Sequence, residues 1–196
     1  MPPFTFIDAL AARREAPLSA LRAAAVLFVA ALTAAAAQIS IPLPFTAVPF
    51  TFQPMVVLLG GLALGAKLGL ASQAVYLAAG IAGLPVFAVS ATLPPGPLRL
   101  LGPTGGYLVA YPIAALLVGY LAERGFDRRY LTSIVAMMAG LVVVYAFGAI
   151  WLSVSLGFAG ALAAGVYPFI AADVVKVVAA AGVLPGLWKL LGRASR

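Results

Sequence analysis

Residues 131–157 read LTSIVAMMAGLVVVYAFGAIWLSVSLG, a stretch without a single charged residue. A helix needs about 20 consecutive apolar residues to cross the hydrocarbon core of a bilayer, and this run is longer than that. The rest of the chain has the same character, because 64% of its 196 residues are hydrophobic and only 9% are charged. Such a composition lies outside the range of water-soluble globular domains. The sequence therefore predicts an all-α, polytopic membrane protein.

The same criterion predicts six transmembrane helices in one integral-membrane domain that covers residues 1–196, with an amphipathic cytoplasmic arm at residues 1–21. The predicted spans are residues 22–39, 50–66, 68–83, 104–123, 131–157 and 168–190. The second and third are joined by GAKLG at residues 65–69, which has room only for a tight turn. Prolines in residues 40–49 and 84–103 predict two stiff, extended connections.

The lysine and arginine residues are distributed very unevenly between the two ends of these predicted spans. Ten of the twelve lie at one end: Arg13, Arg14, Arg22, Lys67, Arg124, Arg128, Arg129, Lys189, Arg193 and Arg196. Arg99 alone lies at the opposite end, and Lys176 lies within a span. Because cytoplasmic loops carry the excess of positive charge, both termini are predicted to be cytoplasmic. The two proline-rich connections then face the outside.

The stretch FIAADVVKVV at residues 169–178 places an acid and a base inside the last predicted span. Asp173 lies five residues after Pro168, so at about 1.5 Å per residue it is roughly 7–8 Å below the outer start of the helix. Lys176 is one turn deeper and shares a helix face with Asp173. Each charge costs roughly 2.5–3.5 kcal/mol at mid-membrane. The pair is therefore either a structural ion pair or part of a polar ligand pocket open to the outside.

Other polar residues are expected at the level of this pair. Arg99 is the only cation in the outer loops and can fold over the same pocket. Gln53 and Tyr76 lie in the second and third spans, each as a ligand contact or as a hydrogen-bonding partner between helices. The motif GPTGGY at residues 102–107 begins the fourth span, and backbone N–H groups near Gly105 predict an anion site. Together these groups suit a ligand with one negative charge and a neutral polar head.

Several classes of function are excluded by what the sequence lacks. Without cysteine or histidine, thiolate or imidazole metal sites and Ser-His-Asp triads are not available. The net charge of +7 does not indicate nucleic-acid binding, because the basic residues punctuate apolar segments and form no continuous face. The stretch GGLALGAK at residues 60–67 does not match a phosphate-binding loop, since no Ser or Thr follows the lysine. Any ATP must therefore be hydrolysed by a partner.

Two further hypotheses remain open at this point. One is a small intramembrane enzyme that acts on lipids with Asp173 as a general base, and the other is a scaffold in which the Asp173–Lys176 pair sets the helix register. Small residues at four-residue spacing near and within the first span permit close approach of a partner helix. They include Ala20 and Ala24, and Ala30 and Ala34.

Four stretches in order resemble the BioY family, the biotin-specific substrate-binding (S) components of energy-coupling-factor (ECF) transporters. They are VPFTFQPMVVLLGGLALGAKLG (Val48–Gly69), AAGIAGLPVFA (Ala78–Ala88), LGPTGGYLVAYP (Leu101–Pro112) and YPFIAADVVKVVAA (Tyr167–Ala180). The resemblance implies a six-helix protein of the bacterial cytoplasmic membrane that binds biotin from outside and has no cofactor of its own. It also implies docking by the first helix onto a transmembrane coupling protein carried by a pair of ATPases.

Carried over from the family, the acid and the lysine that contact the biotin head fall on Asp173 and Lys176. The chemistry agrees, because a ureido ring offers N–H donors to a carboxylate and a carbonyl to an ammonium. The apolar part of the ligand is expected against aromatic side chains such as Phe45, Phe50 and Phe87. Its carboxylate is expected to meet Arg99 or the amides near Gly105.

Overall fold

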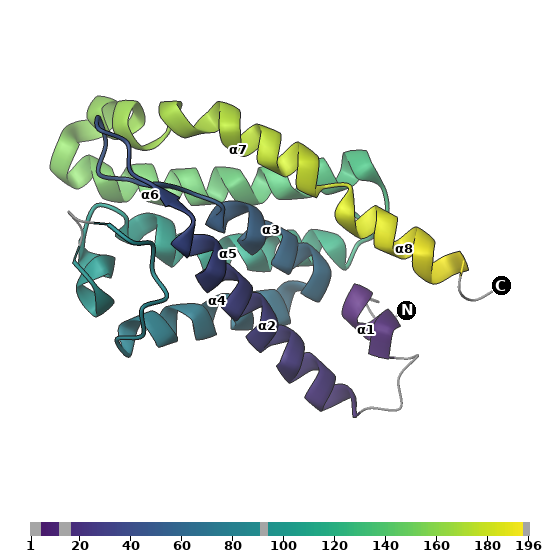
Figure 1. Cartoon of the computed structure of the whole chain (residues 1–196). Helices are drawn as coiled ribbons and strands as arrows, with labels where there is room; N and C mark the ends of the chain where they lie inside the picture. The colour runs from purple at the N-terminus through teal and green to yellow at the C-terminus, as the bar shows by residue number, and fades with distance from the viewer. Residues whose placement is uncertain (1–4, 12–16, 91–93, 194–196) are drawn as a thin grey trace.

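The computed structural model describes residues 5–11, 17–90 and 94–193, which form a bundle of helices with one short β-hairpin (Figure 1). The prediction of an all-α membrane protein agrees with this arrangement. The helices are α1 (Phe6–Ala11), α2 (Leu18–Gln38), α3 (Gln53–Leu64), α4 (Ala66–Ile81), the 3₁₀ helix η1 (Gly96–Leu101), α5 (Gly105–Ala122), α6 (Tyr130–Gly165), α7 (Tyr167–Ala180) and α8 (Val183–Arg193). Strands β1 (Ser40–Ile41) and β2 (Phe50–Thr51) pair in an antiparallel manner.

Helix α5 lies within the bundle and packs against α3, α4 and α6. Small residues make this close packing possible. A side chain at Gly61 would place its Cβ 2.6 Å from the backbone oxygen of Ala115, and one at Gly69 would place it 3.2 Å from the same atom. Membrane helices gain much of their association energy from such close backbone contacts. The glycines of α3 and α4 therefore fix how deeply α5 is embedded.

Four helical segments of the described chain are long and apolar enough to cross a membrane: Leu18–Gln38, Gly105–Ala122, Tyr130–Gly165 and Tyr167–Leu191. Helices α3 and α4, predicted as spans 50–66 and 68–83, are shorter, with 12 and 16 residues. They are separated only by Gly65, whose φ of 84° favours glycine. At about 1.5 Å per residue they extend roughly 18 and 24 Å, less than a full hydrocarbon core of about 30 Å.

The last two predicted spans differ from the observed helices in where they end and where they are interrupted. The span predicted to end at residue 157 continues in α6, which is kinked at Gly157, with a φ of 69°. The span predicted at 168–190 is interrupted at residues 181–182, where α7 ends and α8 follows. A glycine stands at each interruption, consistent with the preference of glycine for helix ends and kinks.

The two proline-rich connections lie together at the end of the bundle opposite α1 and α8 (Figure 1). Residues 40–51 are a hairpin in which Ser40 pairs with Thr51 and Ile41 with Phe50. The second connection was predicted to be extended, but it contains η1, and the indole N–H of Trp151 donates a hydrogen bond to the oxygen of Gly102. The hairpin and η1 thus pack on this end of the bundle, β2 against α2 and η1 against α4 and α5.

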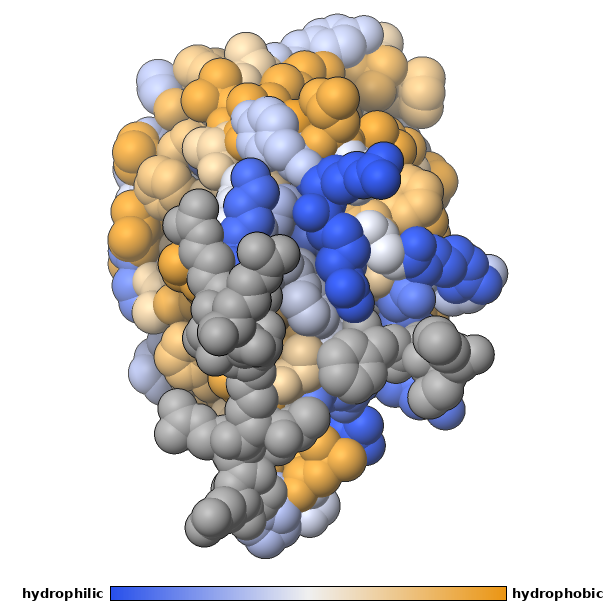
Figure 2. All heavy atoms as spheres, turned by 90° about the vertical axis from the view of Figure 1, so that its right-hand side faces the viewer, coloured by the Kyte–Doolittle hydropathy of each residue, from blue (hydrophilic) through white to orange (hydrophobic). Residues whose placement is uncertain are grey.

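The opposite end of the molecule carries exposed basic side chains. Figure 2 shows hydrophilic residues gathered at this end, whereas most of the surrounding surface in this view is hydrophobic. Hydrogen bonds connect the elements at this end. The indole of Trp188 in α8 donates to Asp127, and the carboxylate of Glu123 accepts from the N–H of Ala66 at the start of α4. The exposed cations are Lys67, Arg124, Arg128, Arg129 and Lys189. Arg13, Arg14 and Arg196, which also entered the charge argument, lie outside the described residues.

The predicted N-terminal arm, residues 1–21, contains helix α1 and, from Leu18 onward, the first turn of α2. Helix α1 packs on the bundle at this basic end. The side chain of Ile7 is buried with Val29 of α2 and Leu64 of α3. Arg22 donates to the carboxylate of Asp8 at 2.6 Å, which ties α1 to α2. Helix α1 is therefore held on the bundle by an apolar contact with α2 and α3 and by an ion pair with α2.

Candidate functional site

Asp173 and Lys176 form a buried ion pair on one face of α7. The lysine Nζ lies 2.7 Å from Oδ1 of Asp173, and the two residues are 6% and 8% exposed. Lys176 Nζ also donates to the backbone oxygen of Thr51 at 2.7 Å. The predicted placement on a common face results from their spacing of three residues. The pair faces the protein interior, so the membrane does not have to accommodate an unpaired charge.

Two other elements complete the surroundings of the pair. From α6, the hydroxyl of Tyr145 donates to Oδ2 of Asp173 at 2.6 Å. From the hairpin, the ring of Phe50 lies with its centroid 3.6 Å from Lys176 Nζ. The ring of Phe52, at the start of α3, lies at 5.2 Å. An ammonium over an aromatic face is stabilised by the ring quadrupole. Phe50, predicted to lie against the apolar part of the ligand, is therefore in contact with the charged group of the pair.

The groups of the pair keep hydrogen-bonding capacity beyond these contacts. An ammonium has three N–H donors, and the described hydrogen bonds of Lys176 use two of them. Each oxygen of an ionised carboxylate has more than one acceptor position, and each oxygen of Asp173 accepts one described hydrogen bond. The site can therefore donate to a carbonyl and accept from an N–H group at adjacent points.

A pocket that is partly open to solvent lies beside the pair. Its empty space, open solvent included, is about 340 Å³. The wall combines the pair with apolar and aromatic groups from four parts of the chain. The lining residues are Val48, Pro49, Phe50, Thr51, Pro54, Tyr107, Val144, Tyr145, Gly165, Phe169, Asp173 and Lys176.

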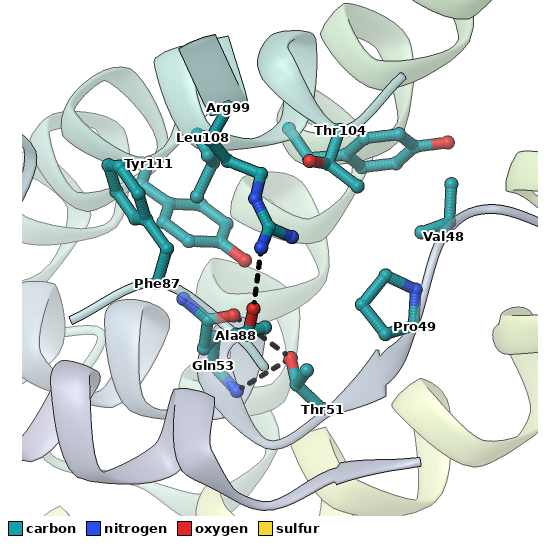
Figure 3. A pocket seen from close by; sticks show the side chains of 11 residues that line it. Val48, Pro49, Thr51, Gln53, Phe87, Ala88, Arg99, Thr104, Leu108 and Tyr111 are labelled. Atoms are coloured by element: carbon teal, nitrogen blue, oxygen red, sulfur yellow. Dashed lines mark hydrogen bonds between the residues drawn. The ribbon is translucent and has the colours of Figure 1, made fainter. Parts of the chain in front are cut away.

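Figure 3 shows a second pocket, which is also partly open to solvent and has about 370 Å³ of empty space, open solvent included. The two share part of their walls, which consists of Val48, Pro49, Thr51 and Tyr107. Arg99 and Thr104 enter the second cavity from one side, whereas Gln53 and Thr51 face it from the other. Phe87 also lines it. A ligand long enough to occupy both cavities would have the ion pair at one end and Arg99 at the other.

Arg99 is 4% exposed and is fixed by backbone oxygens. Its Nε donates to Pro94 at 2.9 Å, and one terminal nitrogen donates to Ala88 at 2.8 Å. The ion pairs within the described chain are Asp8–Arg22, Asp127–Arg128 and Asp173–Lys176, so none of them includes Arg99. The expectation that Arg99 folds inward agrees with this position, although it faces the second cavity and not the one that contains Asp173.

Gln53 and Tyr76 lie next to each other, but only Gln53 lines a cavity. The amide nitrogen of Gln53 donates to the Tyr76 hydroxyl at 2.7 Å, and that hydroxyl donates to the oxygen of Val86 at 3.2 Å. Tyr76 is 1% exposed and lines neither cavity. Its contacts are those of a hydrogen-bonding partner between helices, which was one of the two roles considered from the sequence.

Gly105, predicted to offer a free amide, also lines neither cavity. Its N–H donates to the oxygen of Gly102 at 3.0 Å, and a Cβ there would overlap the backbone oxygen of Leu100. This glycine is therefore required for packing at the start of α5, and its N–H group is already bonded. Phe45, suggested as a wall residue, is 64% exposed and lies outside both cavities.

The alanines predicted to receive a partner helix do not share one surface. Ala20 and Ala24 are exposed, whereas Ala30 is 7% exposed within the core and Ala34 is half-buried against it. Four-residue spacing keeps each pair of alanines on one side of α2. Ala24 and Ala30 are six residues apart, which is not a whole number of helical turns, so the two pairs face different sides of the helix. The exposed small residues farther along α2 are Ala31 and Ala35.

Sequence reasoning missed several residues of the site, among them Tyr145, Tyr107 and Thr104. Tyr145 lies in an apolar run and has no polar neighbour in sequence that would indicate its contact with Asp173. Tyr107 and Thr104 belong to the GPTGGY motif, but only its glycines were singled out. Tyr107 donates to the oxygen of Gly165 at 2.7 Å and lies between the two cavities.

Comparisons with known proteins agree on one family. The BioY family matches residues 11–193 of the chain. A protein named probable biotin transporter BioY, from Pyrococcus horikoshii, is 46% identical over 154 residues, which are 79% of this chain and 87% of the relative. The biotin transporter BioY of Thermotoga maritima is 38% identical over 161 residues, 82% of this chain and 91% of the relative.

A solved structure is also similar to this chain. It is a crystal structure, at 2.1 Å, of the S-component for biotin from an ECF-type ABC transporter. The TM-score is 0.78 at 26% identity, and the similarity covers 87% of this chain and 92% of that one. The matched family region, residues 11–193, contains every residue that lines the two cavities.

Proposed function

The chain belongs to the BioY family, and we propose that it binds biotin with high affinity as the substrate-specific S component of an ECF transporter. It would take up biotin across the cytoplasmic membrane as a transport subunit and not as an enzyme. The observation that carries the proposal is the buried Asp173–Lys176 pair at the wall of a pocket. A ligand with adjacent donors and acceptors accounts for both charges at once.

In this proposal the pair holds the ureido head of biotin. The third N–H of Lys176 donates to the ureido carbonyl, and the carboxylate of Asp173 accepts from a ureido N–H. Tyr145 orients the carboxylate by donating to its other oxygen. Each charge-assisted hydrogen bond of this kind contributes roughly 1.5–3 kcal/mol. The remaining part of the ligand lies between Phe50 and Tyr107 and extends into the second cavity toward Arg99.

The rest of the chain fits a single S-component domain that crosses the membrane six times. The crossings would be α2, α3, α4, α5, α6 and α7 together with α8, with both termini in the cytoplasm. The basic end in Figure 2 supports this orientation, because positive charge is retained on the cytoplasmic side. ATP would be used by a pair of ATPases, joined to this chain through a transmembrane coupling protein that docks near the exposed Ala20 and Ala24.

The orientation predicts opposite labelling of two single-cysteine variants. The chain contains no cysteine, so each introduced thiol reports on one position. Leu98 is 56% exposed in η1 at the proposed outer end, and Lys189 is exposed in α8 at the basic end. In intact cells a membrane-impermeant maleimide is expected to label Leu98→Cys but not Lys189→Cys, which reacts after permeabilisation. Labelling in the reverse order would invert the proposed orientation.

The ligand is tested by calorimetry of the purified protein with biotin, lipoate and thiamine. Lipoate carries a similar carboxylate side chain but no ureido ring, and thiamine carries a positive charge and no carboxylate. We expect tight binding of biotin alone, because the buried pair is left without partners by the other two ligands. Equal binding of lipoate would show that the head group is not recognised. Absence of biotin binding would favour a structural role for the pair.

A further inference from the structure

The side chain of Arg124 is exposed at the basic end, but its position is fixed by local contacts. Its Cζ atom lies over the ring of Tyr120, 3.3 Å from the centroid, and Nη1 donates to the backbone oxygen of Tyr120 at 3.0 Å. Within the described chain this bond uses one of the five N–H groups. A guanidinium held over an aromatic ring keeps its remaining donors in one orientation, and two of them together fit a phosphate. Arg124 is therefore prepared to bind a phosphate group.

The way in which α5 ends explains the position of Arg124. Gly125 has a φ of 89°, a left-handed conformation that favours glycine. Its N–H donates to the oxygen of Ala122 at 2.8 Å, and the N–H of Phe126 donates to the oxygen of Leu121 at 3.2 Å. This pair of bonds around a left-handed glycine commonly ends a helix. It keeps the backbone of Arg124 beside the last turn of α5.

An exposed stripe on α5, here called the α5 stripe, leads to this arginine. All residues of α5 are described, and those that are exposed follow one another at helical spacing, which places them on one side of the helix. They are Val109, Ile113, Leu116 and Tyr120, each 37–47% exposed. At about 1.5 Å per residue the stripe is roughly 16 Å long, and one leaflet contributes about 15 Å of hydrocarbon. The stripe can therefore hold one acyl chain whose head group lies at Arg124.

Tyrosines near the basic end support this placement. Tyr120 ends the α5 stripe, and Tyr130, which is 42% exposed, begins α6 and donates to the oxygen of Val178 at 2.8 Å. Tyrosine and tryptophan are enriched where membrane meets water, because their rings are apolar and their polar tips reach the head groups. Arg124 lies about one helical turn beyond Tyr120. It then lies at the level of the lipid phosphates.

Positive charge at the basic end exceeds what the described acids neutralise. Of the acids described at this end, Asp8 and Asp127 form ion pairs, and Glu123 accepts from a backbone N–H. The exposed cations outside the described ion pairs are Lys67, Arg124, Arg129 and Lys189. Anionic lipids of the cytoplasmic leaflet attract basic residues next to membrane helices. An anionic head group therefore complements this end in charge, whereas a zwitterionic one does not.

We propose that Arg124 and Tyr120 bind the head group of one anionic phospholipid, with an acyl chain of that lipid along the α5 stripe. The lipid phosphate accepts hydrogen bonds from the guanidinium of Arg124, and the ring of Tyr120 holds the guanidinium in place. A lipid bound in this way fixes the end of α5 at the membrane surface. The site goes beyond the proposed function and does not depend on biotin. Only its assignment to the cytoplasmic leaflet uses the proposed orientation.

The test titrates the purified protein in detergent with phosphatidylglycerol or with phosphatidylcholine of the same acyl chains, and native mass spectrometry measures the first bound lipid. We expect the wild type to bind phosphatidylglycerol more tightly. Arg124→Gln is expected to weaken the binding of phosphatidylglycerol about fivefold, as for the loss of one basic residue at an anionic surface. Its binding of phosphatidylcholine is expected to stay the same. Tyr120→Leu keeps an apolar side chain but removes the ring, and we expect it to weaken phosphatidylglycerol in the same direction.

Lys189→Gln is the matched control, because it removes one exposed positive charge at the same end but on another helix. It is expected to change the binding of phosphatidylglycerol less than Arg124→Gln does. Equal losses in the two variants would show that the lipid responds only to net charge, and the proposed site would be overturned. The same holds if the wild type does not prefer phosphatidylglycerol.

Two further results separate the lipid site from the other roles of the chain. If Arg124→Gln binds phosphatidylglycerol normally but loses biotin uptake in cells, Arg124 contacts a protein partner and the lipid site is overturned. If the wild type does not bind biotin but prefers phosphatidylglycerol through Arg124, the proposed function fails and the lipid site stands. Thermal unfolding in detergent without added lipid shows that each variant is folded before it is compared.

Discussion

Asp173→Asn is expected to weaken biotin binding at least about 100-fold. The substitution keeps the size of the side chain but replaces one acceptor oxygen by an NH₂ group, which cannot accept from the ureido ring. It also leaves Lys176 as a buried cation without its acidic partner, whose Oδ1 lies 2.7 Å from the lysine Nζ. Loss of one member of a buried charge pair at a binding site costs roughly 2–5 kcal/mol. The affinity is measured by calorimetry on purified protein.

Asp127→Asn is the matched control for this prediction. Asp127 is also an acid with a fully buried side chain, but it lies at the basic end, where it accepts from Trp188. The same chemical change there is expected to leave the affinity for biotin unaltered. If both variants lose binding equally, the effect comes from general destabilisation. If neither does, Asp173 does not contact the ligand.

Lys176→Met is expected to remove biotin binding. It is also expected to destabilise the ligand-free protein, which the loss of a residue that contacts only the ligand would not do. Methionine retains an unbranched chain beside Phe50 but leaves the Asp173 carboxylate buried with Tyr145 as its described donor. Breaking a buried ion pair from one side typically costs about 3–5 kcal/mol. The free energy of unfolding in mixed detergent micelles measures this cost.

The double variant Asp173→Asn/Lys176→Met separates the two roles of the pair. It removes both charges, so neither remains buried alone, and most of the lost stability is expected to return. Binding is expected to stay absent, because the donor and acceptor for the ureido ring are gone. Lys189→Met, at an exposed position in α8, serves as the control for a charge change alone. A stable Lys176→Met variant with wild-type affinity would contradict the proposed role of the pair.

Local spacing and the cost of buried charge are the features that the sequence predicts most reliably. The sequence places Asp173 and Lys176 on one face because three residues make nearly one helical turn, and it favours a ligand role because charges in a membrane are expensive. The tight turn near Lys67 is expected from its flanking glycines, and Gly65 forms it. Arg99 is expected to fold inward as the only outer cation, and it is buried.

The features that the sequence does not predict depend on how helices are rotated and how loops pack. Tyr145 contacts Asp173 across 28 positions of chain, and nothing in its apolar surroundings indicates which way it faces. Ala30 and Ala34 have the same spacing as Ala20 and Ala24, but the rotation of α2 turns them toward the core. Whether the Thr104 hydroxyl is hydrogen-bonded depends on whether it caps α5, and that is decided by backbone geometry that the sequence does not give.

The most direct test of biotin recognition by the buried pair is a crystal structure of the protein with biotin bound. We expect the ureido oxygen within about 2.7–3.2 Å of Lys176 Nζ and a ureido nitrogen at a similar distance from the Asp173 carboxylate, as hydrogen bonds require. A ureido ring found away from the cavity beside α7, with Asp173 and Lys176 bonded only to protein atoms, would contradict the proposed recognition.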